Sequence, residues 1–262
     1  IRRRLNLEAM LRYDRGETDR ARTLWHDVIE HATAAGDQAL VSAANNNLGV
    51  IFVLQDQVDD ALAAYMRALI AATRLGDRRG IAQAHQNIAI LHRENAAGDE
   101  ADAHFAQAAA HAAEAGMCDD VRGRVDEERA LLLLERGDIE LADATARRAL
   151  VTFRRIADVS GQGEAQRVLG IIALRRRDYV TARNHLEEAA GAAARAHNAL
   201  LDAETREAHA LLERARGDDA AATALEQAAA DGFAAIGAAP WGRRIRVRTA
   251  ALASGQPGLT SS

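Results

Sequence analysis

The chain has 262 residues, of which 27% are charged, and its formal net charge is −5, so no excess of positive charge indicates a nucleic-acid partner. Its single cysteine, Cys118, excludes an intrachain disulfide framework and is typical of a reducing, cytoplasmic compartment. Lysine is absent, which indicates a GC-rich bacterial gene. No apolar run reaches the roughly 18 residues that a membrane helix needs, so the sequence predicts no membrane contact.

A spacing of forty residues organises the chain up to residue 237. One recurring column contains only alanine: Ala21, Ala61, Ala101, Ala142, Ala182 and Ala222. A second column contains only glycine and alanine: Ala9, Gly49, Ala89, Ala130, Gly170 and Ala210. Such a period indicates units that cannot bury an apolar face alone and must stack on their neighbours. The sequence therefore predicts an all-α array of about six helix pairs.

The predicted helices are separated by turns that keep the same spacing. Within the pairs we expect turns at 15–17, 55–57, 95–98, 136–138, 177–178 and 216–218. Between the pairs they fall at Gly36, Gly76, Gly116, Ala157, His197 and Gly237, with a one-residue slip in the loop 116–121. Glycine is expected to supply left-handed C-caps, and aspartate to cap the next helix. Cys118, inside the irregular loop, is expected to be a surface thiol.

The last predicted elements follow residue 237. Pro240 is a favourable first-turn residue, so a capping helix is expected over 238–253. Residues 254–262 contain Ser254, Gly255, Pro257 and Gly258, a composition that predicts a linker or a disordered tail.

The recurring columns resemble the tetratricopeptide repeat in a forty-residue form. The clearest copy is the second, in which Leu48, Gly49, Phe52, Ala61, Tyr65 and Ala68 match the signature spacing of that family. The resemblance weakens in repeats four to six, where Ala146 and Glu226 replace the expected aromatic residue. It implies a right-handed superhelical solenoid over residues 1–237, in which the first helix of each pair lines a concave groove.

Two rows of groove residues follow from this resemblance. The polar row is Asn6, Asn46, Gln86, Glu127, Arg167 and Glu207. The neighbouring apolar row is Met10, Val50, Ile90, Leu131, Ile171 and Leu211. Carboxamides both donate and accept, so the amides, which Asn47 and Asn87 extend, are expected to hold an extended peptide backbone, with the apolar row taking its side chains. Arg124, Glu127, Glu164, Arg167, Glu204 and Glu207 give the second half of the groove mixed charge, which suits a partner with mixed charges.

Enzyme signatures are missing, so we expect no catalysis, cofactor or metal. Without lysine there is no Walker A lysine and no Schiff-base nucleophile. Ser160-Gly161-Gln162-Gly163 lacks the leading glycine of a nucleophile elbow. The histidine pairs His85/His92 and His104/His111 are each seven residues apart, about 10 Å along a helix, which is too far for one metal ion.

A second resemblance involves residues 233–244. The run Phe233-Ala-Ala-Ile-Gly-Ala-Ala-Pro-Trp-Gly-Arg-Arg244 resembles the end of the helical region in large ATP-binding bacterial regulators with a C-terminal LuxR-type DNA-binding domain. The last residues, Gly258-Leu259-Thr260-Ser261-Ser262, resemble the approach to that domain, and both ends of the chain look cut. The resemblance implies a sensor region that binds an inducer, peptide or partner protein, with a possible homo-oligomer. ATP and DNA would bind elsewhere. The arginines Arg243, Arg244, Arg246 and Arg248 are expected to have no acid nearby and are candidates for phosphate contacts.

Three alternatives stay open. The chain could be a free-standing adaptor that binds a peptide or a protein, or a peptide-pheromone receptor, for which the amide row is the best support. An enzyme on this scaffold is the third, and Glu127, Glu164, Arg167 and Glu207 are its only nearby acid–base candidates. The sequence does not say whether the ligand is a peptide, a protein or a small-molecule inducer.

Overall fold

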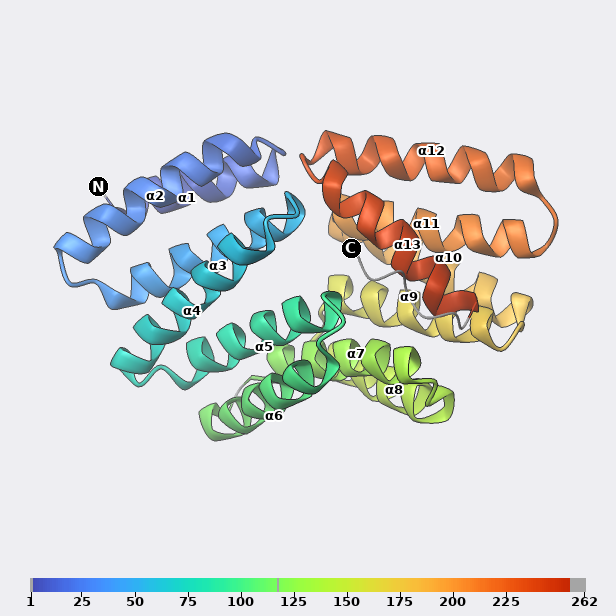
Figure 1. The fold of residues 1–262 in the computed structure, drawn as a ribbon, viewed down its shortest axis with the longest axis horizontal. Coiled ribbons are helices and arrows are strands. Elements are labelled where there is room, and N and C mark those ends of the chain that lie inside the picture. Colours follow the sequence, from blue (N-terminus) through green and yellow to red (C-terminus); the bar gives the residue numbers. More distant parts are fainter. Residues whose placement is uncertain (1, 117, 255–262) are drawn as a thin grey trace. The chain divides into compact units, whose positions relative to one another are not determined.

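A computed structural model describes residues 2–116 and 118–254 of the chain (Figure 1). Within them the regular structure is entirely α-helical, which confirms the predicted all-α repeat fold. The helices are α1 (Arg2–Asp14), α2 (Thr18–Ala34), α3 (Gln38–Leu54), α4 (Val58–Leu75), α5 (Arg78–Glu94), α6 (Gly98–Ala115), α7 (Asp119–Arg136), α8 (Ile139–Arg155), α9 (Val159–Arg175), α10 (Tyr179–Ala196), α11 (Ala199–Ala215), α12 (Asp219–Ala235) and α13 (Ala239–Ser254). Apart from Ser254, the predicted linker 254–262 lies outside the described residues, as do Met117 in the slip loop and the Leu259-Thr260 resemblance.

The forty-residue period has a backbone origin. Each turn that joins two consecutive helices contains, among its described residues, one residue at positive φ. Between the pairs these residues are Gly36, Gly76, Gly116, Ala157, His197 and Gly237. Within the pairs they are Gly16, Asp56, Ala96, Gly137, Arg177 and Gly217. Glycine adopts this conformation freely, whereas a residue with a Cβ is strained in it. The predicted glycine turns therefore have positive φ, as at the left-handed cap Gly76, although Gly116 with ψ −93° lies outside the left-handed helical region, and five other residues also have positive φ.

The small-residue column lies where the two helices of a pair approach most closely. A Cβ atom built on Gly49 of α3 would lie 2.2 Å from Cε1 of Tyr65 on α4. A Cβ atom on Gly170 of α9 would lie 2.7 Å from Cγ of Leu186 on α10. Both large side chains are buried, so they occupy the space that a side chain at the glycine would need.

The expected aspartate caps are present at only some helices. Asp37 accepts a hydrogen bond from the backbone N–H of Leu40, and Asp158 accepts one from that of Gly161. Asp77 and Asp138 stand at the same position of their helices without a side-chain cap bond. The prediction for Cys118 was wrong, since this thiol is buried at 2% exposure and not at the surface.

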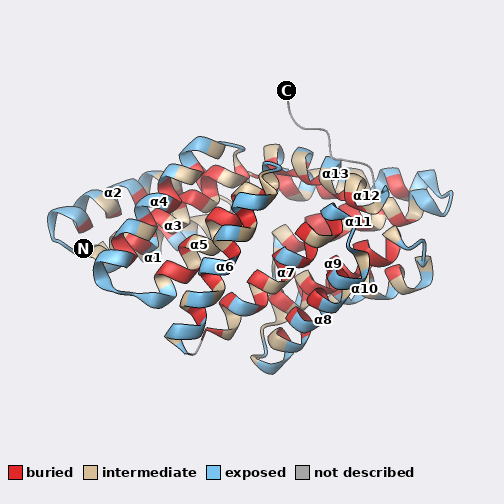
Figure 2. Cartoon of the chain, turned by 60° about the horizontal axis from the view of Figure 1, so that its bottom comes forward, coloured by how far each residue is buried: buried red, intermediate tan, exposed pale blue. Residues whose placement is uncertain are grey.

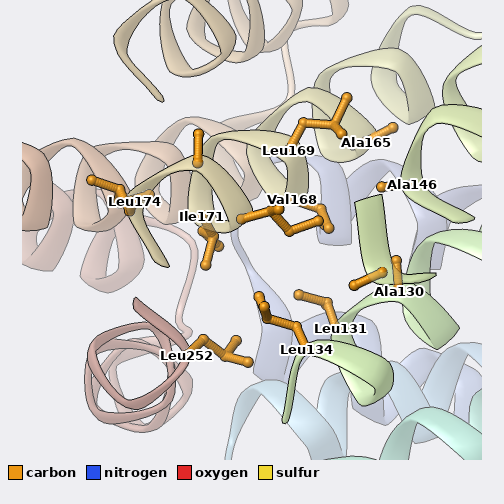
Figure 3. Close-up of a cluster of buried hydrophobic side chains, with 14 of the residues drawn as sticks. Ala130, Leu131, Leu134, Ala146, Ala165, Val168, Leu169, Ile171, Leu174 and Leu252 are labelled. Carbon is orange, nitrogen blue, oxygen red and sulfur yellow. The ribbon is translucent and has the colours of Figure 1, made fainter. Parts of the chain in front are cut away.

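The chain divides into two compact units. The N-terminal unit runs to Val121 and includes 236–238, and the C-terminal unit comprises 122–235 and the chain from Ala239 on. The core of the N-terminal unit contains Trp25, Leu48 and Ile88. That of the C-terminal unit surrounds α9, most of whose residues are buried (Figures 2 and 3). Within the described residues no helix is long and apolar enough to cross a membrane.

Helix α13 departs from the repeat. The first helix of a pair packs on the pair before it, as α11 packs on α9 and α10. α13 contacts α11 and α12 in this way, but it also contacts α9, one pair further back. The predicted capping helix therefore lies across the first helices of two successive pairs.

Candidate functional site

The amide residues of the N-terminal unit occupy equivalent places on three equivalent helices. We call Asn6 on α1, Asn46 and Asn47 on α3, and Gln86 and Asn87 on α5 the amide face. All five side chains are half-buried. The Asn87 Nδ2 atom donates a hydrogen bond to Asn46 Oδ1 over 2.6 Å, so the structure joins α3 and α5 through this face.

The members of the amide face differ in how much hydrogen-bonding capacity they retain for a ligand. Trp25 donates its indole N–H to Asn6 Oδ1 over 3.1 Å, which ties Asn6 to α2. The Asn46–Asn87 bond uses one donor and one acceptor, and each carboxamide retains further hydrogen-bonding capacity. Among the described residues, the Gln86 and Asn47 side chains have no hydrogen-bond partner. The face therefore presents both donors and acceptors on half-exposed side chains.

Apolar side chains adjoin the amide face one helical turn along. Met10 is 44% exposed, and Val50 and Ile90 are half-buried. An extended peptide needs amide partners for its backbone and apolar contacts for alternate side chains. The two rows provide both within one unit.

The charged continuation of the row has a different environment in the C-terminal unit. Glu127, Arg167 and Glu207 are between 1% and 8% exposed. Arg124 pairs with Glu164, and it lies 3.7 Å from Glu127. These side chains join neighbouring helices of the unit, and their predicted role in contacting a ligand stays a prediction.

The remaining members of the charged row are held by α11 and α13. Arg167 Nη2 lies 3.2 Å from Glu204 Oε2, and Arg246 of α13 pairs with Glu207 at 2.9 Å. Burial raises the pKa of Glu207, and Arg246 opposes that shift. The expectation that the arginines of 243–248 have no acid nearby was wrong for Arg246 and for Arg248, which pairs with Glu135. Acids that are remote in sequence come from α7 and α11.

A histidine cluster between α5 and α6 was missed by the sequence analysis. His85 Nδ1 lies 2.9 Å from His104 Nδ1, and the rings of His92 and His104 stack at 5.5 Å between centroids. The His111 ring stacks on that of His85 at 5.9 Å. The sequence prediction considered only histidines of the same helix, whereas these contacts join α5 to α6 between residues 12 to 26 positions apart. Within the part of the chain that the structure describes, no group of three histidine, cysteine or acidic side chains is placed to hold a metal ion.

The fold and these faces define a tetratricopeptide-like helical-repeat protein. No family model matches the chain, and no curated protein matches it. Solved structures do. A Rap protein complexed with competence and sporulation factor is 16% identical, with a TM-score of 0.67 over 94% of this chain and 74% of that one. Aspartyl phosphate phosphatase F from Bacillus subtilis is 13% identical, with a TM-score of 0.67 over 98% and 71%. BtubC from P. vanneervenii is 20% identical, with a TM-score of 0.59 over 83% and 91%. At these identities the likeness shows the fold alone.

Proposed function

We propose that this chain is a non-catalytic binding scaffold whose amide face holds an extended peptide segment. The observation that carries the proposal is the row of half-exposed carboxamides on α1, α3 and α5, with Val50 and Ile90 beside it. Carboxamides that donate and accept in turn match the backbone of a ligand whatever its side chains. The peptide is either free or a segment of a partner protein.

The ion pairs of the candidate acid–base residues support the non-catalytic part of the proposal. The acid–base candidates of the sequence, Glu127, Glu164, Arg167 and Glu207, each lie within 4.0 Å of an oppositely charged side chain of the same unit. An arginine partner favours the charged form of a carboxylate, which disfavours proton donation, although at Glu207 burial outweighs the arginine and raises the pKa. The similar Rap structure is a complex with competence and sporulation factor, and that partner supports a peptide as the ligand class here.

The test needs a peptide ligand that is selected without assuming its sequence. A library of random extended peptides would be panned against the chain, and the affinity of a selected peptide measured by calorimetry. The double substitution Asn46→Ala with Gln86→Ala is expected to weaken binding at least about tenfold, equivalent to about 1.4 kcal/mol. The melting temperature should fall only slightly, because both side chains are half-exposed and one side-chain hydrogen bond, Asn87 to Asn46, is lost.

The matched control removes two exposed amides from the second helices of pairs. The control variant combines Gln57→Ala, at the start of α4, with Gln107→Ala, inside α6. It removes two carboxamides, as the test variant does, but from the second helices of the pairs. Equal affinity of the two double variants and the parent would overturn the amide-face proposal.

For the larger context we propose the sensor region of an ATP-dependent, LuxR-type transcription regulator in the cytoplasm. The run from Phe233 to Arg244 carries this proposal. In the structure the run forms the corner between α12 and α13, where Phe233 and Trp241 are buried and Gly242 meets the Phe233 ring. A stand-alone adaptor would need the same corner, so the alternative keeps equal support.

One measurement separates the two contexts. The intact mass of the native gene product from its own host would far exceed that of these 262 residues if the regulator proposal holds. A mass equal to that of the 262 residues would overturn it and favour the adaptor. The peptide-binding proposal is unaffected by either result.

A further inference from the structure

The C-terminal helix covers part of the face that the first helices of the pairs form in the C-terminal unit. Trp241, Ile245, Thr249 and Leu252 lie on one side of α13 and are all buried. Their spacing of four, four and three residues forms a single apolar stripe. Helix α13 contacts α9 and α11, and Figure 1 shows its ribbon lying against them.

The apolar end of this contact reaches the main core of the unit. Leu252 belongs to the same cluster as Leu131 and Leu134 of α7, and Figure 3 shows it pointing towards them. Arg175 of α9 donates to the backbone carbonyl of Leu252 over 3.0 Å. α13 is thus seated across α7, α9 and α11.

In the polar part of the contact, carboxylates of α7 and α11 bind two arginines of α13 and accept one indole N–H from it. Trp241 donates its indole N–H to Glu204 over 3.1 Å. Arg246 donates from Nη2 to Glu207 Oε1 over 2.9 Å and from Nε to Glu207 Oε2 over 3.3 Å, a bidentate arrangement. Arg248 pairs with Glu135 of α7. The receiving face is therefore acidic at its rim and apolar between.

We propose that this face of α7, α9 and α11 is a second binding site, selective for a basic amphipathic helix of a partner protein, and that α13 is its resident occupant. Helix-in-groove recognition uses anchors at such spacings, and α13 shows which anchors the face accepts: an aromatic N–H donor, two arginines and a terminal leucine. The site lies in the C-terminal unit and does not depend on the amide face.

Three features of α13 make it exchangeable. No pair of the described helices follows it, so its outer side is left uncovered by the stack. Two of its contacts are ion pairs, and the Arg246 side chain is 45% exposed, so water and salt compete for it. Its opposite side carries the exposed Arg243 and Val247. A partner helix with the same anchors gains the same contacts when α13 leaves.

The test uses a fluorescent synthetic peptide of residues 239–254 as the probe and the full chain as the receptor. Replacing Arg246 and Arg248 by alanine weakens the resident helix without changing the face. This variant should bind the peptide with at least about tenfold lower Kd than the parent. Arg195→Ala with Arg243→Ala removes the same charge from exposed positions and should leave the Kd of the parent unchanged.

A charge exchange separates recognition from general loosening. Adding Glu207→Arg to the Arg246/Arg248 variant should abolish binding of the parent peptide, and a peptide carrying Arg246→Glu should restore it. Equal binding of the peptide to all these chains, or to none, would overturn the proposal. The Asn46/Gln86 variant should bind the 239–254 peptide normally, so failure of the amide face is distinguishable.

A second measurement needs no variant. In the parent chain the amide hydrogens of α13 should exchange at least about tenfold faster than those of α9, and excess peptide should accelerate the α13 exchange further. Exchange of α13 only together with α9, with no effect of peptide, would overturn the proposal even if the arginine variants failed to fold.

Discussion

Arg246 and Glu207 form a bidentate ion pair between α13 and α11, in which the carboxylate is almost fully buried and the guanidinium is half-exposed. Burial raises the pKa of Glu207 even with the arginine in place. The pair therefore opposes a desolvation cost that the carboxylate bears in the folded state.

Replacing Arg246 by alanine should lower the free energy of unfolding by about 1–2 kcal/mol at neutral pH, less than for a fully buried pair because Arg246 is partly solvated. The loss should shrink near pH 5. Without the guanidinium the pKa of Glu207 rises further, and a protonated Glu207 has no unpaired charge. Urea unfolding of the parent and the variant at both pH values measures the difference.

Two further variants control this prediction. The double change Arg246→Ala with Glu207→Gln should recover most of the loss at neutral pH, since no buried charge remains. Arg243→Ala, on the exposed side of α13, should stay within about 0.5 kcal/mol of the parent. A loss that is independent of pH and is not recovered by the double change would contradict the ion-pair account.

The contact between Gly49 and Tyr65 predicts that Gly49→Ala destabilises the chain when the tyrosine ring is present and stabilises it when the ring is absent. Gly49→Ala should destabilise the parent by about 1–3 kcal/mol, because its new Cβ meets the buried ring. Gly49→Leu should cost more. After Tyr65→Val removes the ring, Gly49→Ala should instead stabilise by roughly 0.5–1 kcal/mol, since alanine favours helix over glycine.

A thermal-melt double-mutant cycle on the four chains with Gly or Ala at 49 and Tyr or Val at 65 measures this coupling. Additive effects would mean that the ring does not occupy the glycine's space. The register of the small-residue column would then be incorrect.

The turns and the small-residue column were predictable because each rests on a local requirement. A residue at positive φ favours glycine, and a close helix approach favours glycine or alanine, so both requirements leave a mark at a fixed spacing. Gly36, Gly76 and Gly116 carried the first signal, and Gly49 and Gly170 the second.

The contents of the charged row were less predictable, because burial there depends on a helix that is remote in sequence. Glu207 occupies the position equivalent to Asn46, which is half-exposed, and nothing in the repeat shows that α13 returns over it. The contact of His85 with His104 was not predicted for a different reason, although α5 and α6 are consecutive helices. It joins two helices whose facing sides follow only from their packing.

The histidine cluster should make stability depend on pH. Burial, together with His104 and His111, lowers the pKa of His85 to about 4 from 6.5. Between these values the unfolded chain binds a proton that the folded chain does not. The free energy of unfolding should therefore fall as the pH drops from about 6.5 towards 4.

His85→Asn should reduce the fall in melting temperature between about pH 7.5 and 5, because it removes a group that gains its proton on unfolding. His26→Asn, at an exposed position of α2, is the matched control and should melt like the parent at both pH values. The Nδ1 atoms of His85 and His104 lie 2.9 Å apart, and a hydrogen bond between them needs one ring to donate and the other to accept, so protonating both rings breaks it. Parallel pH profiles of the parent and His85→Asn would contradict this account.

Replacing alanine by glycine should stabilise the chain at the turn residue Ala157 and destabilise it at the helical residue Ala144. Ala157 lies at φ 55°, where its Cβ is strained. Ala144 is an exposed interior residue of α8. Ala157→Gly should raise the free energy of unfolding by roughly 0.5–1 kcal/mol through relief of strain. Ala144→Gly should lower it by about 1 kcal/mol through loss of helix propensity. Chemical denaturation of the two variants measures both signs, and a destabilising Ala157→Gly would show that the turn does not impose the strain.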